Sequence, residues 1–461
     1  GGKGLDSITI GTGVSVFNGT IKAGADADVI DFNGRTVSNA IVGGNAGDDT
    51  ITATANTTLS YMGGGQGGDR IDWSGAGTNT TGKGGKGGDT ITVVGAATTS
   101  TILGNQGFDT ISATALTANT TVYIGSGKGG DSISLGAQIG TVVGGFLNDT
   151  ITSHGAFGGG IIYADALEET VGGDGTGASA DGDDVISMTA GSIAEGATIY
   201  GGGGADTVTF VNGAAAASAL QIDTGKGADF IGNSTTNFFG VAGSGTMNGG
   251  SGHDTLKFNI LNSGLILGGA GNDSIFGAAI SAGGSINGGA GNDTINLTNG
   301  STLQSSIANM ITINAGAGSD SIILSTYTSQ TGTRAGVISG NFLGMVEGVT
   351  AGDVIRLTNT QAVAAGNNWL GDTQIYVAAN AAGVTSAVAS GIGSVAVYKS
   401  GTDMVVAVMG GLNASTWTKF TVVGGSGQIK TTITASAVAM KSSNFGFSVG
   451  TTNNNVGFTF A

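Results

Sequence analysis

One nine-residue pattern recurs along the first two thirds of the chain and limits what the chain can fold into. Its form is Gly-Gly-x-Gly-x-Asp-x-U-x, where U is a large aliphatic residue, and residues 268–276 and 288–296 are complete copies. An Ile, Val or Leu follows each aspartate by two positions, a regularity that abundant glycine alone does not produce. The aspartates of the pattern are Asp6, Asp28, Asp49, Asp69, Asp89, Asp109, Asp131, Asp149, Asp184, Asp206, Asp229, Asp254, Asp273, Asp293 and Asp320.

The spacing of these aspartates predicts a coiled architecture. Successive aspartates lie mostly 18 to 25 residues apart, and every step from Asp49 to Asp109 is 20 residues. A strand rises about 3.3 Å per residue, so a short strand and a turn use about half of that length. Each repeat is therefore predicted to form one coil with two short strands and two turns. One turn is the Gly-Asp loop, and the other is a Thr/Asn/Ala turn such as residues 54–58 or 117–121.

Glycine and aspartate at these positions suit the binding of a hard cation. Calcium takes six to eight oxygen ligands at about 2.3–2.6 Å and accepts both carboxylates and backbone carbonyls. Glycines at positions one, two and four let the backbone reach positive φ and turn its carbonyl groups toward an ion. The aspartate supplies charge, and the aliphatic residue two positions later faces the interior of the coil because strand side chains alternate.

The nonapeptide resembles the repeat of RTX (repeats-in-toxin) proteins, which form a calcium-binding parallel β-roll. The resemblance implies an all-β fold: a right-handed parallel β-roll or β-helix solenoid with about one coil per 20 residues, plus a β-rich C-terminal domain. Family members hold ions between the loops of consecutive coils, so multiple calcium ions are expected, in one column because only one turn carries the motif. The calcium ligands implied by the resemblance are Asp6, Asp49, Asp69, Asp89, Asp109, Asp131, Asp206, Asp229, Asp254, Asp273, Asp293 and Asp320, with Gly67, Gly87, Gly204, Gly252, Gly271 and Gly291.

A few loops depart from the pattern. Asp26 and Leu147 replace the glycine at position four, and these two loops are expected to bind calcium weakly or not at all. Asn45 and Asn105 replace the glycine at position two, a milder change because asparagine tolerates left-handed backbone.

Composition narrows the class of protein. Glycine accounts for 92 of the 461 residues without any proline, which excludes collagen. The formal charge is −16, and four glutamates among the 31 acidic residues leave 27 aspartates, a bias that places carboxylates in tight turns. The absence of cysteine excludes disulfides and thiolate metal sites. Only 15 Lys and Arg residues are present, without a basic run, so nucleic acid is not an expected partner. No apolar run is long enough for a transmembrane segment.

Two domains are predicted. Residues 1–324 form the calcium-binding roll, with an acidic insertion at about 153–183, where successive aspartates are 35 residues apart. This insertion is interpreted as a solvated loop or expanded coil, with an extra calcium site or subunit contact as the alternative. Residues 325–461 form a β-rich C-terminal domain for capping, assembly or secretion, in which 395–398 and 404–408 flank a hairpin turn. Residues 453–461 form either a final strand or an uncleaved secretion signal. The chain opens in the middle of a motif, so we expect it to be a piece of something longer.

An enzymatic role is not predicted. The only histidines, His154 and His253, do not form the H-E-x-x-H motif of zinc proteases. The G-x-S-x-G match at Ser448 has no histidine after it, unlike the lipase fold. The G-x-G-x-x-G match at 82–87 follows from composition and carries no dinucleotide-binding signal.

The function expected from the resemblance is that of a structural surface-layer (S-layer) protein, because the chain most resembles the C-terminal part of bacterial RTX S-layer proteins. Such a protein is secreted by type I export and self-assembles into a calcium-held lattice on the cell surface. Its expected partners are copies of itself, with a cell-surface glycan or lipopolysaccharide as an anchor. The alternatives are the C-terminal calcium-folding and secretion domain of a larger secreted enzyme or toxin, and an adhesin, a filament subunit or an ice-binding roll.

Overall fold

The computed structural model describes residues 1–11, 16–116, 121–137, 140–155, 157, 159–165, 181–189, 196–210, 217–233, 240–281, 284–297, 312–326, 341–347, 353–359, 375–378, 395–400, 403–409, 417–422, 438–440, 447–452 and 455–460. These residues are all-β and contain no helix: parallel strands stack as a β-solenoid of about 12 turns, spaced about 20 residues apart. No helix long and apolar enough to cross a membrane occurs among them. The chain divides into two compact units, Gly1–Phe239 and Gly240–Ala461.

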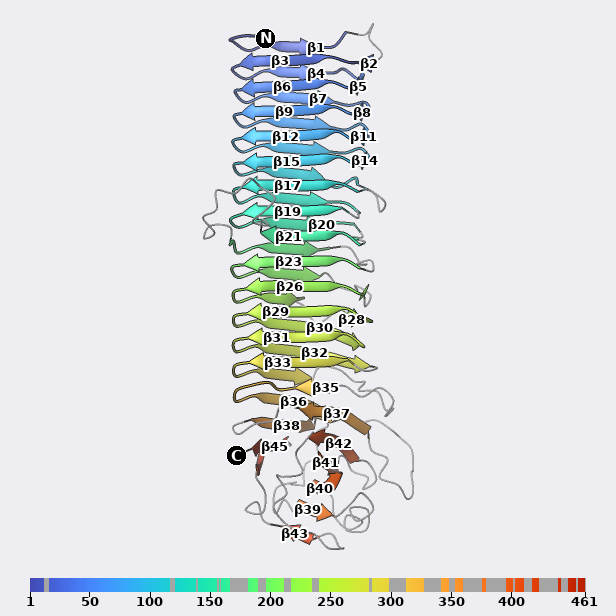
Figure 1. The fold of residues 1–461 in the computed structure, drawn as a ribbon, viewed down its shortest axis with the longest axis vertical. Coiled ribbons are helices and arrows are strands. Elements are labelled where there is room, and N and C mark those ends of the chain that lie inside the picture. Colours follow the sequence, from blue (N-terminus) through green and yellow to red (C-terminus); the bar gives the residue numbers. More distant parts are fainter. Residues whose placement is uncertain are drawn as a thin grey trace, which may run out of the picture. The chain divides into compact units, whose positions relative to one another are not determined.

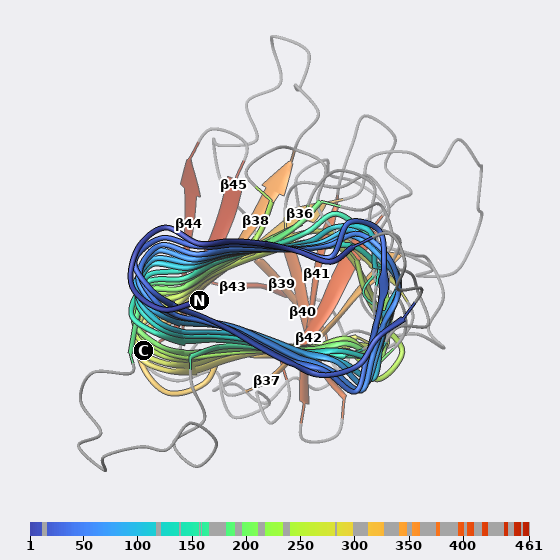
Figure 2. The same ribbon diagram turned by 90° about the horizontal axis from the view of Figure 1, so that it is seen from above.

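In the first unit, the coils alternate between two long parallel sheets, and most coils contribute one strand to each (Figures 1 and 2). The first sheet contains β3 (Thr20–Ala25), β6 (Ile41–Ala46), β9 (Tyr61–Gln66), β12 (Thr81–Lys86), β15 (Thr101–Gln106), β17 (Tyr123–Lys128), β19 (Thr141–Phe146), β21 (Ile161–Asp165), β23 (Thr198–Gly203) and β26 (Gln221–Lys226). The second contains β1 (Ser7–Thr9), β4 (Val29–Asp31), β7 (Thr50–Ala53), β10 (Arg70–Trp73), β13 (Thr90–Val93), β16 (Thr110–Ala113), β18 (Ser132–Leu135), β20 (Thr150–Ser153), β22 (Val185–Met188), β24 (Thr207–Phe210), β25 (Ala217–Ser218) and β27 (Phe230–Gly232).

The core is a stack of aliphatic side chains between these two sheets. The aliphatic residue of each repeat pairs in register with its counterpart in the next coil, as Ile71 does with Ile91. Both side chains are fully buried, and Val42 and Met62 of the opposite sheet are equally buried. The prediction that position eight faces the interior is therefore confirmed.

A third, short sheet departs from the expectation of two strands per coil. The turn opposite the aspartates contains a brief parallel strand in each of five coils, namely β2 (Val16–Phe17), β5 (Thr36–Ser38), β8 (Thr57–Thr58), β11 (Gly77–Thr78) and β14 (Ala97–Thr98). Threonine favours extended backbone, and the equal 20-residue steps bring these threonines into register. Gly77 in this sheet faces the buried Trp73 ring, which leaves no space for a side chain there.

The second unit begins with the same coil arrangement. Its strands are β28 (Gly240–Ala242), β29 (Thr246–Ser251), β30 (Thr255–Asn262), β31 (Leu265–Ala270), β32 (Ser274–Ser281), β33 (Ser285–Ala290), β34 (Thr294–Leu297), β35 (Thr312–Asn314), β36 (Ser321–Thr326), β37 (Asn341–Glu347) and β38 (Val354–Asn359). Here too the aliphatic residues stack in register, Leu256 on Ile275 and Ile275 on Ile295.

Antiparallel strand pairs join the parallel ones in the later described part of the second unit. Its strands are β39 (Ile375–Ala378), β40 (Val395–Ser400), β41 (Asp403–Met409), β42 (Trp417–Val422), β43 (Val438–Met440), β44 (Phe447–Thr452) and β45 (Asn455–Phe460). The predicted hairpin is present, because β40 and β41 pair antiparallel from Val395–Val408 to Ser400–Asp403. Residues 455–460 form a strand that pairs with β44 and β38. The domain boundary drawn at 324/325 stays a prediction.

Candidate metal centre

Each aspartate of the repeat lies at the turn that joins the two long sheets. In one coil the chain leaves β9, passes Gly67 and Gly68, reaches Asp69 and enters β10. Asp69 precedes the inward-facing Ile71 by two residues and therefore shares its inward direction. Its side chain is only 2% exposed. The aspartates thus form an internal column instead of an acidic surface.

One carboxylate oxygen of each aspartate joins neighbouring coils. The backbone N–H of Asp49 donates to Oδ1 of Asp69 at 2.8 Å, and the N–H of Asp69 donates to Oδ1 of Asp89 at 2.8 Å. The same bond, at 2.6–2.9 Å, recurs from Asp6 to Asp229 in the first unit and from Asp254 to Asp353 in the second. We call this run of bonds the aspartate ladder.

The second oxygen is buried and, in most coils, has no hydrogen-bond partner within the described residues. This is the case for Oδ2 of Asp28, Asp49, Asp69, Asp89, Asp109, Asp149, Asp184, Asp206, Asp273, Asp293 and Asp320. A buried polar atom without a partner costs about 1–3 kcal/mol, and a charged one costs more. Such a regular column of unpaired acceptors indicates that a positive charge or a proton belongs beside each one.

Position one of the repeat provides the space for this oxygen. A Cβ atom added to Gly44, Gly64 or Gly84 would overlap Oδ2 of the aspartate in the same coil. Position one of the coil that contains Asp131 is Ser126 instead, whose hydroxyl donates to the carbonyl oxygen of Gly144 in the next coil, and burial raises the pKa of Asp131 to about 6. In the coils of Gly44, Gly64 and Gly84, the glycine of position one therefore makes room for the carboxylate.

A backbone carbonyl from the next coil borders the same space. A Cβ atom added to Gly268 would overlap both Oδ2 of Asp273 and the carbonyl oxygen of Gly288. Equivalent pairs surround Gly201, where Oδ2 of Asp206 and the carbonyl oxygen of Thr224 approach. Neither oxygen of such a pair can donate a hydrogen bond while the carboxyl is ionised. A proton on the carboxyl or a cation between the two oxygens is therefore favoured.

Burial raises the pKa of the ladder carboxyls. The pKa rises from 3.8 to about 7 for Asp69 and Asp109, to about 8 for Asp206 and to about 9 for Asp149. Desolvation is the main cause in each case; the donated backbone N–H opposes it, and neighbouring carboxylates add to it. Without a counter-ion, several rungs of the ladder therefore hold a proton near neutral pH.

The aspartates predicted as ligands lie in one column, with one exception in detail, and their role as calcium ligands stays a prediction. Asp6 is only half-buried, and its Oδ2 accepts the N–H of Gly2 at 2.9 Å. The remaining predicted aspartates occupy the ladder described above. The position-four glycines predicted to turn the backbone have positive φ in every case: Gly67, Gly87, Gly204, Gly252, Gly271 and Gly291 lie between 108° and 139°.

The loops that depart from the pattern keep the same geometry. Asp26 and Leu147 adopt φ of 79° and 72° at position four, and the asparagines at position two adopt 85° and 87°. The aspartates that follow, Asp28 and Asp149, stand in the ladder like the others. Whether these two loops bind calcium more weakly stays a prediction.

Two buried aspartates were missed by the sequence motif. Asp353 accepts the N–H of Asp320 at 2.8 Å, although no glycine precedes it at position four. The signal that could have found it is the Asp-x-Ile spacing, because Ile355 is buried and pairs with Ile322. The second is Asp165, which occupies the sheet position of Gly145.

Asp165 is the first acidic residue of the insertion. Its two oxygens accept the N–H groups of Gly182, at 3.2 Å, and Gly203, at 2.8 Å. Burial raises the pKa of Asp165 to about 6. Residues 166–180, the middle of the insertion, lie outside the described residues, so its interpretation as a loop or an extra site stays a prediction.

An outer ladder runs beside the inner one. The position-five side chain accepts the N–H of position five in the next coil, as Asp48 does from Gly68 and Asn272 does from Asn292. His253 fills this role through Nδ1, which accepts the N–H of Asn272 at 2.7 Å. This exposed histidine is therefore a structural member of the turn.

The donors available to a cation are one carboxylate per coil and backbone carbonyls. No three Asp, Glu, His or Cys side chains of the described residues converge as a metal site. Calcium accepts carbonyl oxygens and a variable ligand number, so a set of this kind fits it better than it fits metals that need nitrogen or sulfur. The residues present thus fit calcium through their oxygen atoms and unpaired charge.

Comparison with known proteins does not assign the chain to a family. No protein-family model matches the chain, and no curated protein matches it.

Proposed function

We propose that this protein is a calcium-stabilised structural protein of the extracellular surface. The observation that carries the proposal is the column of buried, unpaired Oδ2 atoms, several of which lie beside a backbone carbonyl of the next coil. Calcium, when bound, would supply positive charge to this column. The aspartates hold the ion with Oδ2 and keep adjacent coils in register with Oδ1.

The same column explains why folding would depend on the compartment. Extracellular calcium modules bind with dissociation constants of about 10⁻⁴–10⁻³ M, so their sites stay empty at cytosolic calcium levels. An empty ladder buries carboxylates against one another, and the glycine-rich chain loses much entropy on folding. The chain is then exported unfolded and folds coil by coil outside, where neighbouring coils stabilise each other as in other solenoids.

The proposed biological role is a surface layer: a secreted, non-enzymatic lattice of many copies, anchored to a cell-surface glycan or lipopolysaccharide. The regular coils supply repeating surfaces for contacts between copies, which supports this role over a soluble carrier. The alternative is the calcium-folding and secretion domain of a larger secreted enzyme, toxin or adhesin. A solenoid is compatible with both, so the assembly state separates them.

Two neighbouring aspartates provide the test of calcium binding. Asp49 is in the inner ladder and is 2% exposed, whereas Asp48 is exposed in the outer ladder. Isothermal calcium titration of the chelator-treated full chain should show fewer bound ions for Asp49→Asn and an unchanged number for Asp48→Asn. Magnesium serves as the control ion. A metal-free chain that keeps its β circular dichroism at pH 8 and takes up no calcium contradicts the proposal.

Electron microscopy of the calcium-loaded chain tests the assembly. Two-dimensional sheets with a regular repeat support the surface layer, because a lattice needs copies that associate laterally. Single rods support the domain of a larger secreted protein, and fibres support a filament or adhesin subunit. Sheets that persist after chelation would contradict the calcium dependence while leaving the lattice role in place.

A further inference from the structure

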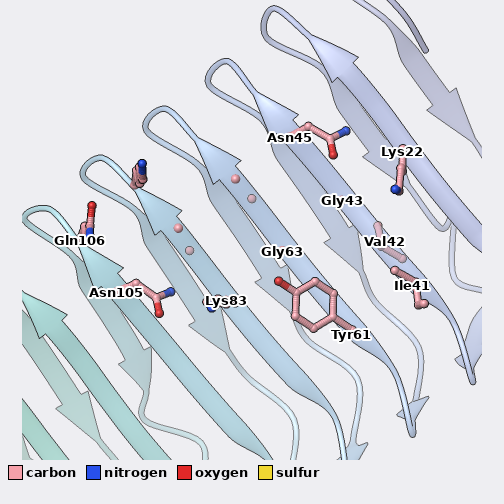
Figure 3. A pocket seen from close by; sticks show the side chains of 15 residues that line it. Lys22, Ile41, Val42, Gly43, Asn45, Tyr61, Gly63, Lys83, Asn105 and Gln106 are labelled. Carbon is pink, nitrogen blue, oxygen red and sulfur yellow. The ribbon is translucent and has the colours of Figure 1, made fainter. Parts of the chain in front are cut away.

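A shallow groove of about 450 Å³ lies on the outer face of the first sheet, across β3, β6, β9, β12 and β15 (Figure 3). Register explains its shape. The outward position of successive strands is Lys22, Gly43, Gly63 and Lys83, so two glycines leave a gap between two lysines. The parallel strands are about 4.8 Å apart, so the gap is long enough for an extended molecule instead of a small ion.

The floor of the groove combines an aromatic ring with open backbone. The Tyr61 ring leans over Gly63, because a Cβ atom there would lie 2.8 Å from the ring and the hydroxyl oxygen. Above Gly43, by contrast, the nearest atom to an added Cβ is Oδ1 of Asn45, at 3.6 Å. Tyr61 is 39% exposed. A flat ring of a ligand can therefore reach the backbone at Gly43 and contact the face or edge of Tyr61.

The groove carries positive charge on an acidic protein. Lys22, Lys83 and Lys86 line it, and they are three of 15 Lys and Arg residues in a chain of formal charge −16. None of the three makes an ion pair within the described residues. Their ammonium groups are therefore available to an anion, and the negative potential of the surrounding protein is locally interrupted.

Amide groups complete the lining at one end of the groove. Asn45, Asn105 and Gln106 offer both donors and acceptors there, on the side opposite Ile41 and Tyr61 (Figure 3). Nδ2 of Asn105 is buried and has no acceptor within the described residues. A ligand rich in hydroxyl groups would satisfy such donors, whereas an apolar ligand would leave them unpaired.

From the lysines, the aromatic ring, the glycine floor and the amides we infer that this groove binds an acidic saccharide. The carboxylate groups of the saccharide contact Lys22 and Lys83, a sugar ring packs on Tyr61 above Gly43, and hydroxyl groups meet the amides. The inference supplies the chemistry of the glycan partner in the proposed function and rests on that function only for its biological setting. Saccharide binding and calcium binding are measured separately, so the experiments can contradict the saccharide inference without contradicting the proposed calcium-stabilised function, and the reverse.

The test is a titration of the folded full chain with a hyaluronan tetrasaccharide, with chitotetraose as the neutral saccharide. We expect saturable binding of the acidic saccharide, weaker binding in high salt, and at least about tenfold weaker binding of chitotetraose. The double variant Lys22→Gln/Lys83→Gln should bind the acidic saccharide at least about tenfold more weakly. Lys226→Gln removes one exposed charge from β26, outside the groove, and should bind as the unchanged chain does.

A second variant tests the shape of the groove without changing its charge. Gly43→Leu fills the floor of the groove. The strand should accept leucine because Gly43 has ordinary φ, an added Cβ makes only an ordinary van der Waals contact with Oδ1 of Asn45 at 3.6 Å, and Leu103 occupies the same sheet position on β15. Circular dichroism should stay unchanged while saccharide binding is lost. Equal affinity for both saccharides, no binding by the unchanged chain, or binding that survives both variants overturns the inference. Variants that instead lose only self-association would assign the groove to a second copy, which also overturns it.

Discussion

At the scale of single residues, two adjacent glycines show how differently the repeat uses the same amino acid. Gly44 faces inward against Oδ2 of Asp49, whereas Gly43 faces outward into the groove. We predict that Gly44→Ala lowers the free energy of unfolding by about 1–3 kcal/mol, because the new methyl group displaces a buried carboxylate. Gly43→Ala should change it by less than about 0.5 kcal/mol, as expected at an open surface site. Thermal unfolding of the two variants under identical calcium concentrations makes the comparison, and equal losses would contradict the assigned role of position one.

Leu147 gives a second prediction at this scale, with the opposite sign. It adopts φ of 72° and is 48% exposed, so it combines a strained backbone with little packing. A non-glycine residue in this region costs about 1–2 kcal/mol, so Leu147→Gly should stabilise the protein by about 1 kcal/mol. Asn45→Gly is the matched control, since asparagine tolerates φ of 85° at low cost and should gain less. A lower unfolding midpoint for Leu147→Gly would show that the leucine side chain contributes packing.

At the scale of strands and turns, much of the arrangement follows from the repeat, because inward Asp-x-U residues at equal spacing must stack. Sequence therefore predicted the parallel coils, the buried aliphatic column and the positive φ of Gly67 and its equivalents. It did not predict the short strands at the threonine turn, where Thr58 and Thr78 pair only because neighbouring coils align them. Nor did it assign Asp353 to the ladder, since the register of β36 and β38 places that residue there without a glycine motif.

The role of Asp353 leads to a prediction for this last rung. The Asp320 side chain is 2% exposed, and its N–H donates to Oδ1 of Asp353. We expect Asp353→Ala to lower the free energy of unfolding by about 1–3 kcal/mol, because it leaves a buried donor without an acceptor. Asp353→Asn keeps an oxygen at the same position and should restore most of that loss. Protection of the Asp320 amide from hydrogen exchange provides the local measurement, and unchanged protection in Asp353→Ala would contradict the bond's contribution.

At the scale of the whole molecule, the ladder links folding to pH as well as to metal. Burial raises the pKa of Asp69 and Asp109 to about 7 and that of Asp206 to about 8, from 3.8 for a carboxyl without such burial. The folded, metal-free chain therefore binds more protons than the unfolded chain between about pH 4 and pH 8. The stability due to these protons is fully present below about pH 4 and is lost as the pH rises through about 7–8.

Metal-free protein should accordingly become less stable as the pH rises, in contrast to proteins whose carboxylates are ionised and paired. We predict that the melting temperature of chelator-treated protein falls by more than about 5 °C between pH 5 and pH 8, since many rungs contribute in the same direction.

Calcium should reverse the trend, because it needs ionised ligands and competes with protons for them. The rise in melting temperature on adding calcium should therefore be larger at pH 8 than at pH 5. Scanning calorimetry at the two pH values, with and without calcium, measures all four quantities. A metal-free protein that gains stability toward pH 8 would show that its carboxylates are already paired. A stabilisation by calcium that does not depend on pH would show that calcium does not bind to the ladder carboxylates.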